Sequence, residues 1–443
     1  MTQVVIATVP FVDEDTPLAA PAVLKSVLES HGIHCVGLDL NIYIYNKILQ
    51  HPNRHLFLDF FYNQNIHESI VSDLIDMFEF YVYEITKHNP DIVGLSLFSH
   101  NSQVATTWIS AMIKESNPNI KIVIGGPGLE TLENAFFKFP DRLKQLGLIN
   151  DYIVGDAEES LVEYVKNNKD YPGINSHHWK KIKNFSDVPT PNYDDYTFLL
   201  YRTPLLHVID SRGCVQDCEF CDVIAFWDKF QYKTAQNIFN QMIEYTHKYK
   251  QYRFQFGSSL SNGNLREFKK LMKLMSDYNK TVSLTEQLHW NGSFIIRSKK
   301  SHDEELWKLI KESNAFLFCG VESLTERVRN GLGKKFKDDD LMHHLKMAQK
   351  YQVPMNLLLI ATYPGETDEE FEKVKQWFVD NKHYANNTVM QVQLTLPSIL
   401  PGTKLESRID LNSFVNEKEI RLHRGNELKD IVESCGFITR AFY

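Results

Sequence analysis

The stretch Ser211-Arg212-Gly213-Cys214-Val215-Gln216-Asp217-Cys218-Glu219-Phe220-Cys221 places three cysteines within eight residues, at i, i+4 and i+7. Three thiolates at this spacing can each bind one iron of a cubane cluster. Without a fourth cysteine nearby, one iron keeps an open coordination site. A structural zinc site needs four ligands, and a redox CxxC pair needs no third cysteine. The stretch therefore predicts a [4Fe-4S] cluster on Cys214, Cys218 and Cys221, with a zinc loop or three unligated thiols as the alternative.

The cysteine stretch directly follows an expected strand at residues 205–210, and strands alternate with helices from there on. Further strands are expected at 253–256, 282–288, 315–321, 355–361 and 389–396. Helices are expected at 235–249, 265–278, 304–312, 340–352 and 369–381. Six β/α units are two short of a closed eightfold barrel, so the pattern predicts a partial (β/α)6 barrel with its working face at the carboxyl ends of the strands.

The residues before the barrel show a second βαβ alternation. Short apolar strands are expected at 4–7, 36–40, 92–97, 120–124 and 152–154, with helices at 19–30, 69–87, 104–114 and 158–166. This order predicts an α/β, Rossmann-like, doubly wound parallel sheet. Periodicity fails around Pro172, Gly173, Pro189 and Pro191, as is typical of a linker. The expected domains are 1–166, a linker at 167–203, the barrel at 204–400 and a mostly helical extension at 401–443.

Composition limits the possible partners and location. Hydrophobic residues make up 43% of the chain and charged residues 23%, which excludes long disorder, collagen-like repeats and coiled coil. The net charge of −8 disfavours sequence-blind binding to nucleic acid or anionic lipid. No apolar run approaches the roughly 18 residues that span a bilayer, and the first residues are not a targeting signal. A cytoplasmic protein without a membrane span or a nucleic-acid partner is expected.

The CxxxCxxC spacing, with Phe220 before the last cysteine, resembles the radical S-adenosylmethionine (radical SAM) superfamily. The resemblance implies that the open iron binds the amino and carboxylate groups of S-adenosylmethionine. One electron from the cluster then cleaves this cofactor to a 5′-deoxyadenosyl radical, while the protein orients the reactants and excludes water. A flavodoxin- or ferredoxin-like reductant and a small-molecule or peptide substrate are the implied partners.

Further motifs of the second domain are similar to those of this superfamily. The segment from Phe316 to Ser323 looks like the fourth-strand motif, which implies that Glu322 and Ser323 face the ribose or methionine part of the cofactor and that Gly320 permits close approach. A capped strand end is the alternative. Trp290-Asn291-Gly292 and Arg297, expected after the third strand, also look similar to relatives, with Arg297 as a partner for a carboxylate.

Two other segments are less specific. Residues 360–367 resemble the fifth-strand segment beside the adenine, but Thr367 and Glu370 also form a capping box, which gives a purely structural alternative. The segment Phe256-Gly257-Ser258-Ser259 departs from the family pattern because it lacks the acidic residue expected to hold the cofactor's amino group. A hydroxyl or a backbone group is expected to serve there instead.

Glycine-containing loops dominate the first domain and follow three of its strands. In an open parallel sheet, ligands bind outside the carboxyl ends of the strands. Gly94–Leu97, Ile124–Gly128 and Val154–Glu159 resemble the cobalamin-binding domain that precedes some radical SAM barrels. The implied cobalamin contacts are Ser96, Leu97, Gly125, Gly126, Pro127, Ala157 and Glu158. His34-Cys35-Val36-Gly37 lacks the aspartate of the motif that supplies a lower histidine ligand, so a scaffold with an empty or repurposed pocket is the alternative.

The two domains together resemble class B radical SAM methyltransferases. This implies cobalamin-dependent methyl transfer to an unactivated carbon or phosphorus centre. A radical cyclase or rearrangement enzyme is an alternative, as is a methylthiotransferase, which is disfavoured because the first domain has no second cysteine triad. A non-catalytic metal-binding module is the alternative of another class. No motif names the substrate.

The remaining conspicuous features are expected to be structural. The aromatic residues of 57–62 and of the helix that contains Phe78, Phe80, Tyr81 and Tyr83 are interpreted as packing surface. The isolated cysteines Cys35, Cys319 and Cys435 are interpreted as buried small hydrophobes. Residues 334–340 are expected to form a solvated loop that leads into a helix.

Overall fold

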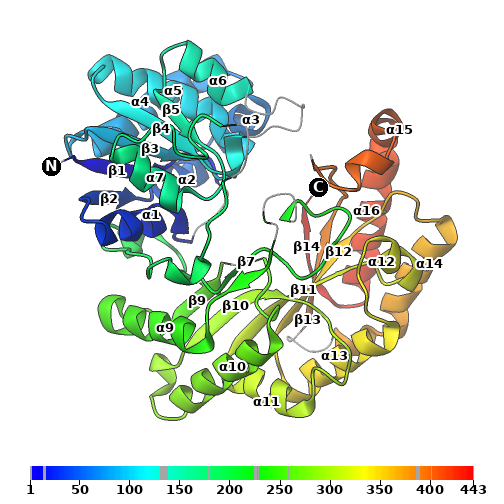
Figure 1. Cartoon of the computed structure of the whole chain (residues 1–443). Helices are drawn as coiled ribbons and strands as arrows, with labels where there is room; N and C mark the ends of the chain where they lie inside the picture. Colours follow the sequence, from blue (N-terminus) through cyan, green and yellow to red (C-terminus); the bar gives the residue numbers. More distant parts are fainter. Residues whose placement is uncertain are drawn as a thin grey trace. The chain divides into compact units, whose positions relative to one another are not determined.

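The computed structural model describes residues 2–12, 16–129, 138–176, 180–223, 227, 229–257, 259–385, 390–400 and 402–442. The chain divides into two compact units, Met1–His207 and Val208–Tyr443 (Figure 1). Each unit is built on its own parallel sheet.

The first unit contains a five-stranded parallel sheet in the order β2-β1-β3-β4-β5. Its strands are β1 (Val4–Thr8), β2 (Cys35–Leu38), β3 (Ile92–Ser96), β4 (Lys121–Gly125) and β5 (Asp151–Ile153). Its helices are α1 (Ala19–Ser30), α2 (Asn41–Gln50), α3 (Arg54–Asn63), α4 (Val71–Thr86), α5 (Gln103–Ser116), α6 (Lys138–Gln145) and α7 (Ala157–Val165). Helix α1 packs beside α7, and α4 packs beside α5, so both faces of the sheet are covered. The predicted doubly wound fold is confirmed.

The aromatic segments of this unit form most of one core layer. Phe57, Phe60 and Phe61 of α3 are fully buried, which confirms the packing interpretation for these three; Tyr62 is 43% exposed, so it was wrong for that residue. In α4, Phe78 and Tyr81 are buried, but Phe80 and Tyr83 are 41% and 62% exposed, so the interpretation was wrong for those two residues. The helix turns them away from the sheet because only one face of α4 contacts the core.

The segment expected to be a linker packs within the first unit. The Asp195 carboxylate lies 2.5 Å from the buried Lys25 ammonium of α1. Tyr196 donates a 2.6 Å hydrogen bond to the Leu18 carbonyl, and Tyr201 donates a 2.8 Å bond to the buried Asp39 carboxylate. These bonds hold the end of the segment against the first sheet.

The second unit contains a seven-stranded sheet in the order β14-β13-β12-β11-β10-β9-β6. Its strands are β6 (Leu206–Val208), β9 (Arg253–Phe256), β10 (His289–Phe294), β11 (Ala315–Glu322), β12 (Met355–Ile360), β13 (Met390–Thr395) and β14 (Ile438–Phe442). Its helices are α9 (Ala235–Tyr249), α10 (Leu265–Asn279), α11 (Glu304–Glu312), α12 (Glu326–Gly331), α13 (Asp338–Tyr351), α14 (Asp368–Asp380), α15 (Leu411–Asn416) and α16 (Lys418–Ser434). The helices between successive strands line one side of the curved sheet (Figure 1), which confirms the partial barrel.

The mostly helical extension is confirmed by α15 and α16, but one expectation for this unit was wrong. The third strand is β10, not residues 282–288, where a short 3-10 helix at Leu284–Glu286 leaves Leu284 81% exposed. The register with β9 and β11, rather than local apolar content, sets where this strand forms. The extension also contributes strand β14, which pairs with β13 and so covers an edge that would otherwise be open.

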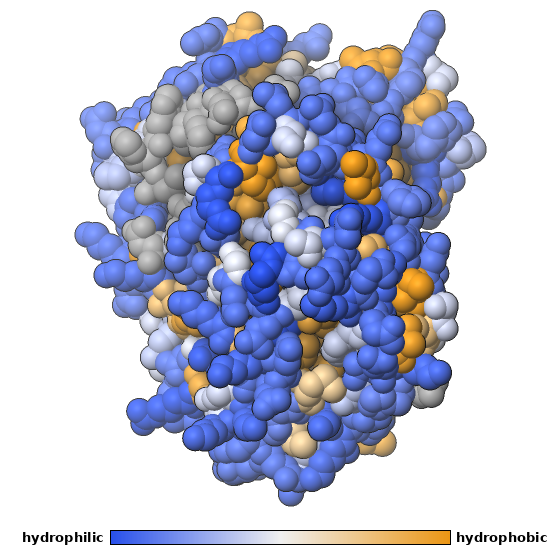
Figure 2. All heavy atoms as spheres, turned by 90° about the vertical axis from the view of Figure 1, so that its right-hand side faces the viewer, coloured by the Kyte–Doolittle hydropathy of each residue, from blue (hydrophilic) through white to orange (hydrophobic). Residues whose placement is uncertain are grey.

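The surface carries few apolar side chains on the face shown in Figure 2, where hydrophobic groups form scattered small patches. Among the described residues, no helix combines the length and apolar character needed to cross a membrane.

Candidate cluster and cofactor site

The cysteine loop is closed at its base by a short antiparallel pair. Strand β7 (Ser211–Arg212) pairs with β8 (Gln231–Tyr232), so the two ends of the intervening chain are held together. Gly213 follows β7 with φ +81°, and a Cβ there would lie 2.8 Å from the Lys229 carbonyl oxygen. Glycine is therefore required where the loop leaves the strand.

The three cysteines lie close together in this loop. The Gln216 amide donates a 3.3 Å hydrogen bond to Cys214 Sγ, and the Cys221 amide donates a 3.2 Å bond to the Cys218 carbonyl. Burial raises the pKa of the Cys218 thiol to about 11, and the Lys334 ammonium works in the opposite direction. Burial also raises the pKa of Cys221. All three thiols are free of disulfides.

The arrangement fits a cubane better than a single metal ion. Within the described ranges, no three His, Cys, Asp or Glu side chains gather around one point that suits a single ion. In a cubane each cysteine binds a different iron, so the thiols need not converge on one point. The three-thiol donor set is also the one that iron–sulfur clusters use.

Segments distant in sequence contact the cysteine loop and hold it in place. The sequence alone did not predict these contacts. The Glu219 amide donates a 3.1 Å hydrogen bond to the Leu332 carbonyl, and the Leu405 amide donates a 2.9 Å bond to the Glu219 carbonyl. Lys404 pairs with Asp217, and Arg408 pairs with Glu219. An apolar cluster packs beneath Phe220, with members Val328, Leu332, Tyr363, Leu405, Ile360, Ile399 and Ile409. This cluster limits the access of water to one side of the loop.

A buried ion pair lies beside the cysteines. Lys334 Nζ is 2.9 Å from Glu322 Oε1 and 5.8 Å from the centre of the Phe220 ring. Lys334 is only 7% exposed, so the interpretation of 334–340 as a solvated loop was wrong for this residue. Burial lowers the pKa of Lys334, but Glu322 and Cys218 outweigh it and raise the pKa above its ordinary value. The site therefore holds a fixed positive charge next to its thiols.

Gly320 makes room for this ion pair. A Cβ at Gly320 would lie 2.6 Å from Glu322 Oε1 and 2.8 Å from Lys334 Nζ. The space above the glycine, expected to admit the cofactor, is thus occupied by the two charged side chains. Glu322 is the last residue of β11 and has φ +65°. Its carboxylate lies beside Gly320, two residues earlier on the same strand.

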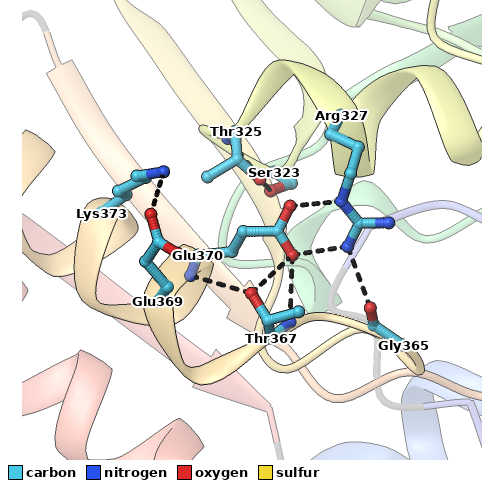
Figure 3. Close-up of polar contacts among 8 residues, drawn as sticks. All are labelled: Ser323, Thr325, Arg327, Gly365, Thr367, Glu369, Glu370 and Lys373. Atoms are coloured by element: carbon cyan, nitrogen blue, oxygen red, sulfur yellow. Dashed lines mark hydrogen bonds and ion pairs between the residues drawn. The ribbon is translucent and has the colours of Figure 1, made fainter.

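The ends of β11 and β12 are joined by a polar clasp (Figure 3). Arg327 of α12 pairs with Glu370 through two nitrogens and donates a 2.9 Å hydrogen bond to the Gly365 carbonyl. The capping box predicted at the start of α14 is confirmed, because Thr367 and Glu370 cap each other. Ser323 accepts a 3.2 Å hydrogen bond from the Thr325 amide, so its hydroxyl serves a local turn. Its contact with the cofactor stays a prediction.

Arg297 lies at the carboxyl end of β10 and has a free donor. Its NH2 group donates to the carbonyls of Asn262 and Gly263 at 3.1 and 2.8 Å, whereas its Nε is buried and has no partner in the part of the chain that the structure describes. Burial lowers the pKa of Arg297, and Cys214 works in the opposite direction. An unpaired guanidinium donor near the cysteine loop fits a carboxylate ligand. The Trp290–Gly292 segment lies inside β10, not after it, and Ser258 lies outside the described residues.

A buried histidine pair, which the sequence did not reveal, supports the loops after β9 and β10. His302 Nδ1 lies 2.6 Å from His344 Nε2, and His344 Nδ1 lies 2.8 Å from the Asp340 carbonyl oxygen. Since that carbonyl only accepts, His344 Nδ1 carries the proton and its Nε2 accepts from His302. Asn262 lies 3.4 Å from His302 Nε2 and also bonds the Ile295 backbone at 2.9 Å. The pair therefore fixes the loop that carries Arg297.

In the first unit, the strand order reverses between β1 and β3, the place where ligands bind in this type of sheet. Ser96 is half-buried there and Leu97 is fully buried. Gly126 has φ +110°, and a Cβ there would lie 2.3 Å from the Leu97 carbonyl oxygen. The glycines after β4 thus allow two loops to pack together; close approach of a ligand is not what requires Gly126. Gly125 is the last residue of β4, and Pro127 begins a short 3-10 helix directly after Gly126.

Two residues beside this edge, Phe98 and Asn101, have an exposed group or a group unpaired within the described ranges. Phe98, directly after Leu97, is 59% exposed, and Asn101 Oδ1 is buried without a partner. Ala157 begins α7 and is half-buried. Glu158 is buried and lines a cavity of about 430 Å³ between α1, α7 and residues 182–189. The assignment of the predicted cobalamin contacts stays a prediction.

Known proteins resemble the chain in sequence. Residues 208–378 match the radical SAM superfamily. An uncharacterized methyltransferase of Pyrococcus horikoshii, PH0819, is 22% identical over 72% of this chain and 70% of its own length. The ribosomal protein uS12 methylthiotransferase RimO of Caldanaerobacter subterraneus is 22% identical over 51% of this chain and 50% of its own length.

Solved structures resemble the chain in fold. The radical SAM methyltransferase TsrM of Kitasatospora setae, with cobalamin and a [4Fe-4S] cluster bound, superposes with a TM-score of 0.64 at 14% identity, over 92% of this chain and 78% of TsrM. The cobalamin-dependent radical enzyme OxsB gives a TM-score of 0.64 at 14% identity, over 96% of this chain and 56% of OxsB. At this identity the likeness shows a shared fold. The cysteine loop, the partial barrel and the sequence match together identify residues 208–378 as a radical SAM domain, and the chain as an enzyme.

Proposed function

We propose that this enzyme is a cobalamin-dependent radical SAM methyltransferase that methylates an unactivated carbon or phosphorus centre. The observation that carries the proposal is the presence, in one chain, of a three-cysteine loop on a partial barrel and of a parallel sheet in the order β2-β1-β3-β4-β5. That order places a ligand crevice at the carboxyl ends of β1 and β3. The names of PH0819, TsrM and OxsB support methyl transfer and cobalamin.

The residues of the second unit would have separate roles in binding the cluster and S-adenosylmethionine. Cys214, Cys218 and Cys221 would hold the cluster, and Arg297 Nε would bind a carboxylate of S-adenosylmethionine. Glu322, held by Lys334, would accept hydrogen bonds from the same cofactor. When bound, the cluster with S-adenosylmethionine supplies a 5′-deoxyadenosyl radical and cobalamin supplies a methyl carrier. The apolar cluster beneath Phe220 would keep water from this chemistry.

Methylthiotransferase activity is the second candidate, because RimO proteins are among the relatives. Sulfur insertion of that type would need a second metal cluster as a sulfur source. Cys35 is the only cysteine in the first 207 residues of the sequence. The first unit therefore offers no second triad, and methyl transfer is the better supported reaction.

The test is anaerobic reconstitution with iron, sulfide and hydroxocobalamin, followed by incubation with S-adenosylmethionine and a reductant. We expect 5′-deoxyadenosine to form and, once a substrate is found, the product to gain the mass of one methylene group. Failure to cleave S-adenosylmethionine would exclude a radical enzyme. Undiminished turnover without cobalamin would exclude the cobalamin-dependent form. A loss of hydrogens without added carbon would indicate a cyclase.

Alanine replacement of Cys214, Cys218 or Cys221 provides the matched variants. Each is expected to abolish the [4Fe-4S] signal in electron paramagnetic resonance and 5′-deoxyadenosine formation, because a cubane held by two thiolates is not retained. Cys435, at the end of α16, is the control: Cys435→Ala should keep both. Zinc without iron or sulfide in the anaerobically purified protein would contradict the cluster assignment.

A further inference from the structure

Side-chain amides gather on the face of the second sheet that the helices leave free. In a parallel sheet, residues paired in register point to the same side. Asn291 is level with Gln255 and Phe316. Asn356 is level with Phe318 and Gln391, and Gln393 is level with Leu358. We call the side chains of Gln255, Asn291, Asn356, Gln391 and Gln393 the amide face.

The alternate residues of the same strands show that the amide face is opposite the helices. Those residues are nearly all apolar and at most 4% exposed: Phe254, Phe256, Trp290, Phe294, Ala315, Leu317, Cys319, Met355, Leu357, Leu359, Met390, Val392 and Leu394. They form the core beneath α10, α11, α14 and α16 (Figure 1). The strict alternation in Met390-Gln391-Val392-Gln393-Leu394-Thr395 is the sequence signal that predicts this division.

The charged groups near the amide face lie at its two ends, where the Lys334–Glu322 ion pair covers Gly320 at the carboxyl end. Arg253 and His289 lie at its amino-terminal end, and Glu322 lies at its carboxyl end. Between these ends, the described residues of β9 to β13 direct no charged side chain to this face. Besides amides, the face carries Ser293, Phe316, Phe318, Gly320, Leu358 and Ile360.

Two of the amides have unused hydrogen-bonding groups. Asn356 is 3% exposed, and its Nδ2 donates a 3.3 Å bond to Gln393 Oε1, while its Oδ1 has no hydrogen-bond partner among the described residues. Asn291 Oδ1 is also buried, and the described part of the chain offers it no partner. A buried acceptor without a donor is unfavourable, and an apolar side chain of similar shape would avoid this cost. The packing of the fold therefore does not account for these two amides, and a ligand would.

The amide face leads to the cofactor site. Gln393 is level with Leu358, which is level with Gly320, and Glu322 follows two residues later on β11. Phe316 and Phe318 lie on the same face, with ring centres 5.1 Å apart. The two rings are inclined by 73°, so a planar group can stack on one of them. Asn291 lies one strand away from Phe316, and Asn356 lies one strand away from Phe318, so an amide is within reach of the edge of a group stacked on either ring.

We propose that the amide face binds the substrate through an uncharged planar amide group, in which an N–H donor stands beside a carbonyl acceptor. Carboxamides both donate and accept, so they match such a group on both of its edges. A carboxylate or a phosphate would find no cation among the amides, and the Lys334 ammonium beside Gly320 is already paired with Glu322. A peptide amide and the lactam edge of a heterocycle share this chemistry. The inference rests on the proposed radical chemistry, because it assigns the substrate class of that same site.

The test measures binding to the cluster-reconstituted enzyme with S-adenosylmethionine present, by saturation-transfer NMR at millimolar probe concentration. N-acetylphenylalaninamide represents the peptide source and uracil the lactam source. N-acetylphenylalanine, with a carboxylate in place of the terminal amide, is the charged counterpart. At least one neutral probe is expected to bind, and the amide to bind at least about tenfold more tightly than the acid if the source is a peptide. Absence of binding by both neutral probes, or tighter binding of the acid, would overturn the proposal.

The variant Asn356→Leu separates a ligand role from a structural one. It should weaken the neutral probe at least about tenfold while the melting temperature stays the same or rises, because an unsatisfied acceptor is removed. Asn279→Leu is the matched control: Asn279 is also 3% exposed, but its amide bonds the backbone of Leu288 and Glu312. It should lower the melting temperature without changing probe affinity. Equal destabilisation by both variants, with unchanged probe binding, would overturn the proposal.

Measuring 5′-deoxyadenosine in the same samples shows whether a negative result contradicts the amide-face proposal or the proposed function. If the enzyme cleaves S-adenosylmethionine but binds neither neutral probe, the amide-face proposal alone is wrong. If it does not cleave S-adenosylmethionine, the proposed function is wrong whatever the probes show.

Discussion

Lys334 and Glu322 show how single residues shape the cluster site. Both are nearly buried, and each is the other's closest opposite charge, with 2.9 Å between Nζ and Oε1. Removing one partner of a buried pair leaves the other charge uncompensated, which costs far more than loss of an exposed pair. The stability of this part of the barrel therefore depends on the pair as a unit.

Lys334→Met is expected to lower the free energy of unfolding by roughly 3–5 kcal/mol, because the Glu322 carboxylate stays buried alone. Urea denaturation with intrinsic fluorescence measures this change. Lys350→Met is the control, since Lys350 and its partner Glu304 are both more than half exposed. It should leave the free energy of unfolding nearly unchanged, because water screens this exposed pair. Equal effects of the two variants would contradict a buried pair.

Gly320→Ala is expected to cost about 1–3 kcal/mol, because the new methyl group displaces Glu322 and Lys334 from their present positions. Weaker binding of S-adenosylmethionine, measured by equilibrium dialysis, should accompany it. Gly331→Ala in α12 is the matched control, as nothing lies within 4 Å of its added Cβ. That variant should be neutral or stabilising by roughly 0.5–1 kcal/mol.

At the scale of elements, the loops after the strands are fixed by polar contacts between segments that follow neighbouring strands. The Arg327–Glu370 clasp joins α12 to α14, and the His302–His344 pair joins the loop after β10 to α13. Both devices connect elements that follow neighbouring strands, and so the carboxyl ends of β9 to β12 move little relative to one another. A rigid rim of this kind is what a preorganised cofactor site needs.

The histidine pair predicts a loss of stability in weak acid. Burial lowers the pKa of His302 to about 2 and that of His344 to about 4, from an ordinary value near 6.5. Neutral histidines therefore contribute stability above pH 6.5, and this contribution is lost as the pH falls toward 4. For His344 it amounts to roughly 3 kcal/mol at most.

The measurement compares the free energy of unfolding at pH 7 and pH 5 in the wild type and in His344→Gln. The variant should lose less stability between these two pH values than the wild type, although it is less stable at pH 7. His383→Gln, which changes an exposed histidine outside the pair, should keep the wild-type dependence. A parallel decline in all three proteins would show that other groups control the acid response.

At the scale of the whole molecule, the chain combines two parallel sheets that differ in how they present ligands. The first sheet reverses its strand order between β1 and β3, whereas the second keeps its barrel strands in chain order from β9 to β14. The groups assigned to cobalamin lie in the first unit, and the cluster thiols lie in the second. The two binding functions are therefore expected to be separable.

Gly126→Ala is expected to lower hydroxocobalamin affinity, because it forces apart two loops at the carboxyl edge of the first sheet. It should leave the [4Fe-4S] signal unchanged. Cys218→Ala should show the reverse pattern, with normal cobalamin binding and no cluster. Visible absorption titration and electron paramagnetic resonance on both variants test this pair of outcomes. Loss of both signals in either variant would contradict independent sites.

The sequence by itself determined the cluster loop, the α/β class and the division into two sheets. Ligand spacing in the Cys214–Cys221 stretch and the alternation of apolar strands with helices are local properties, which the chain carries before it folds. Only the tertiary structure decided that Lys334 is buried beside Glu322, that residues 404–408 support the cysteine loop and that amides of five separate positions share one face. These features depend on strand register and on contacts between residues up to about 190 positions apart, and no local pattern encodes such pairings.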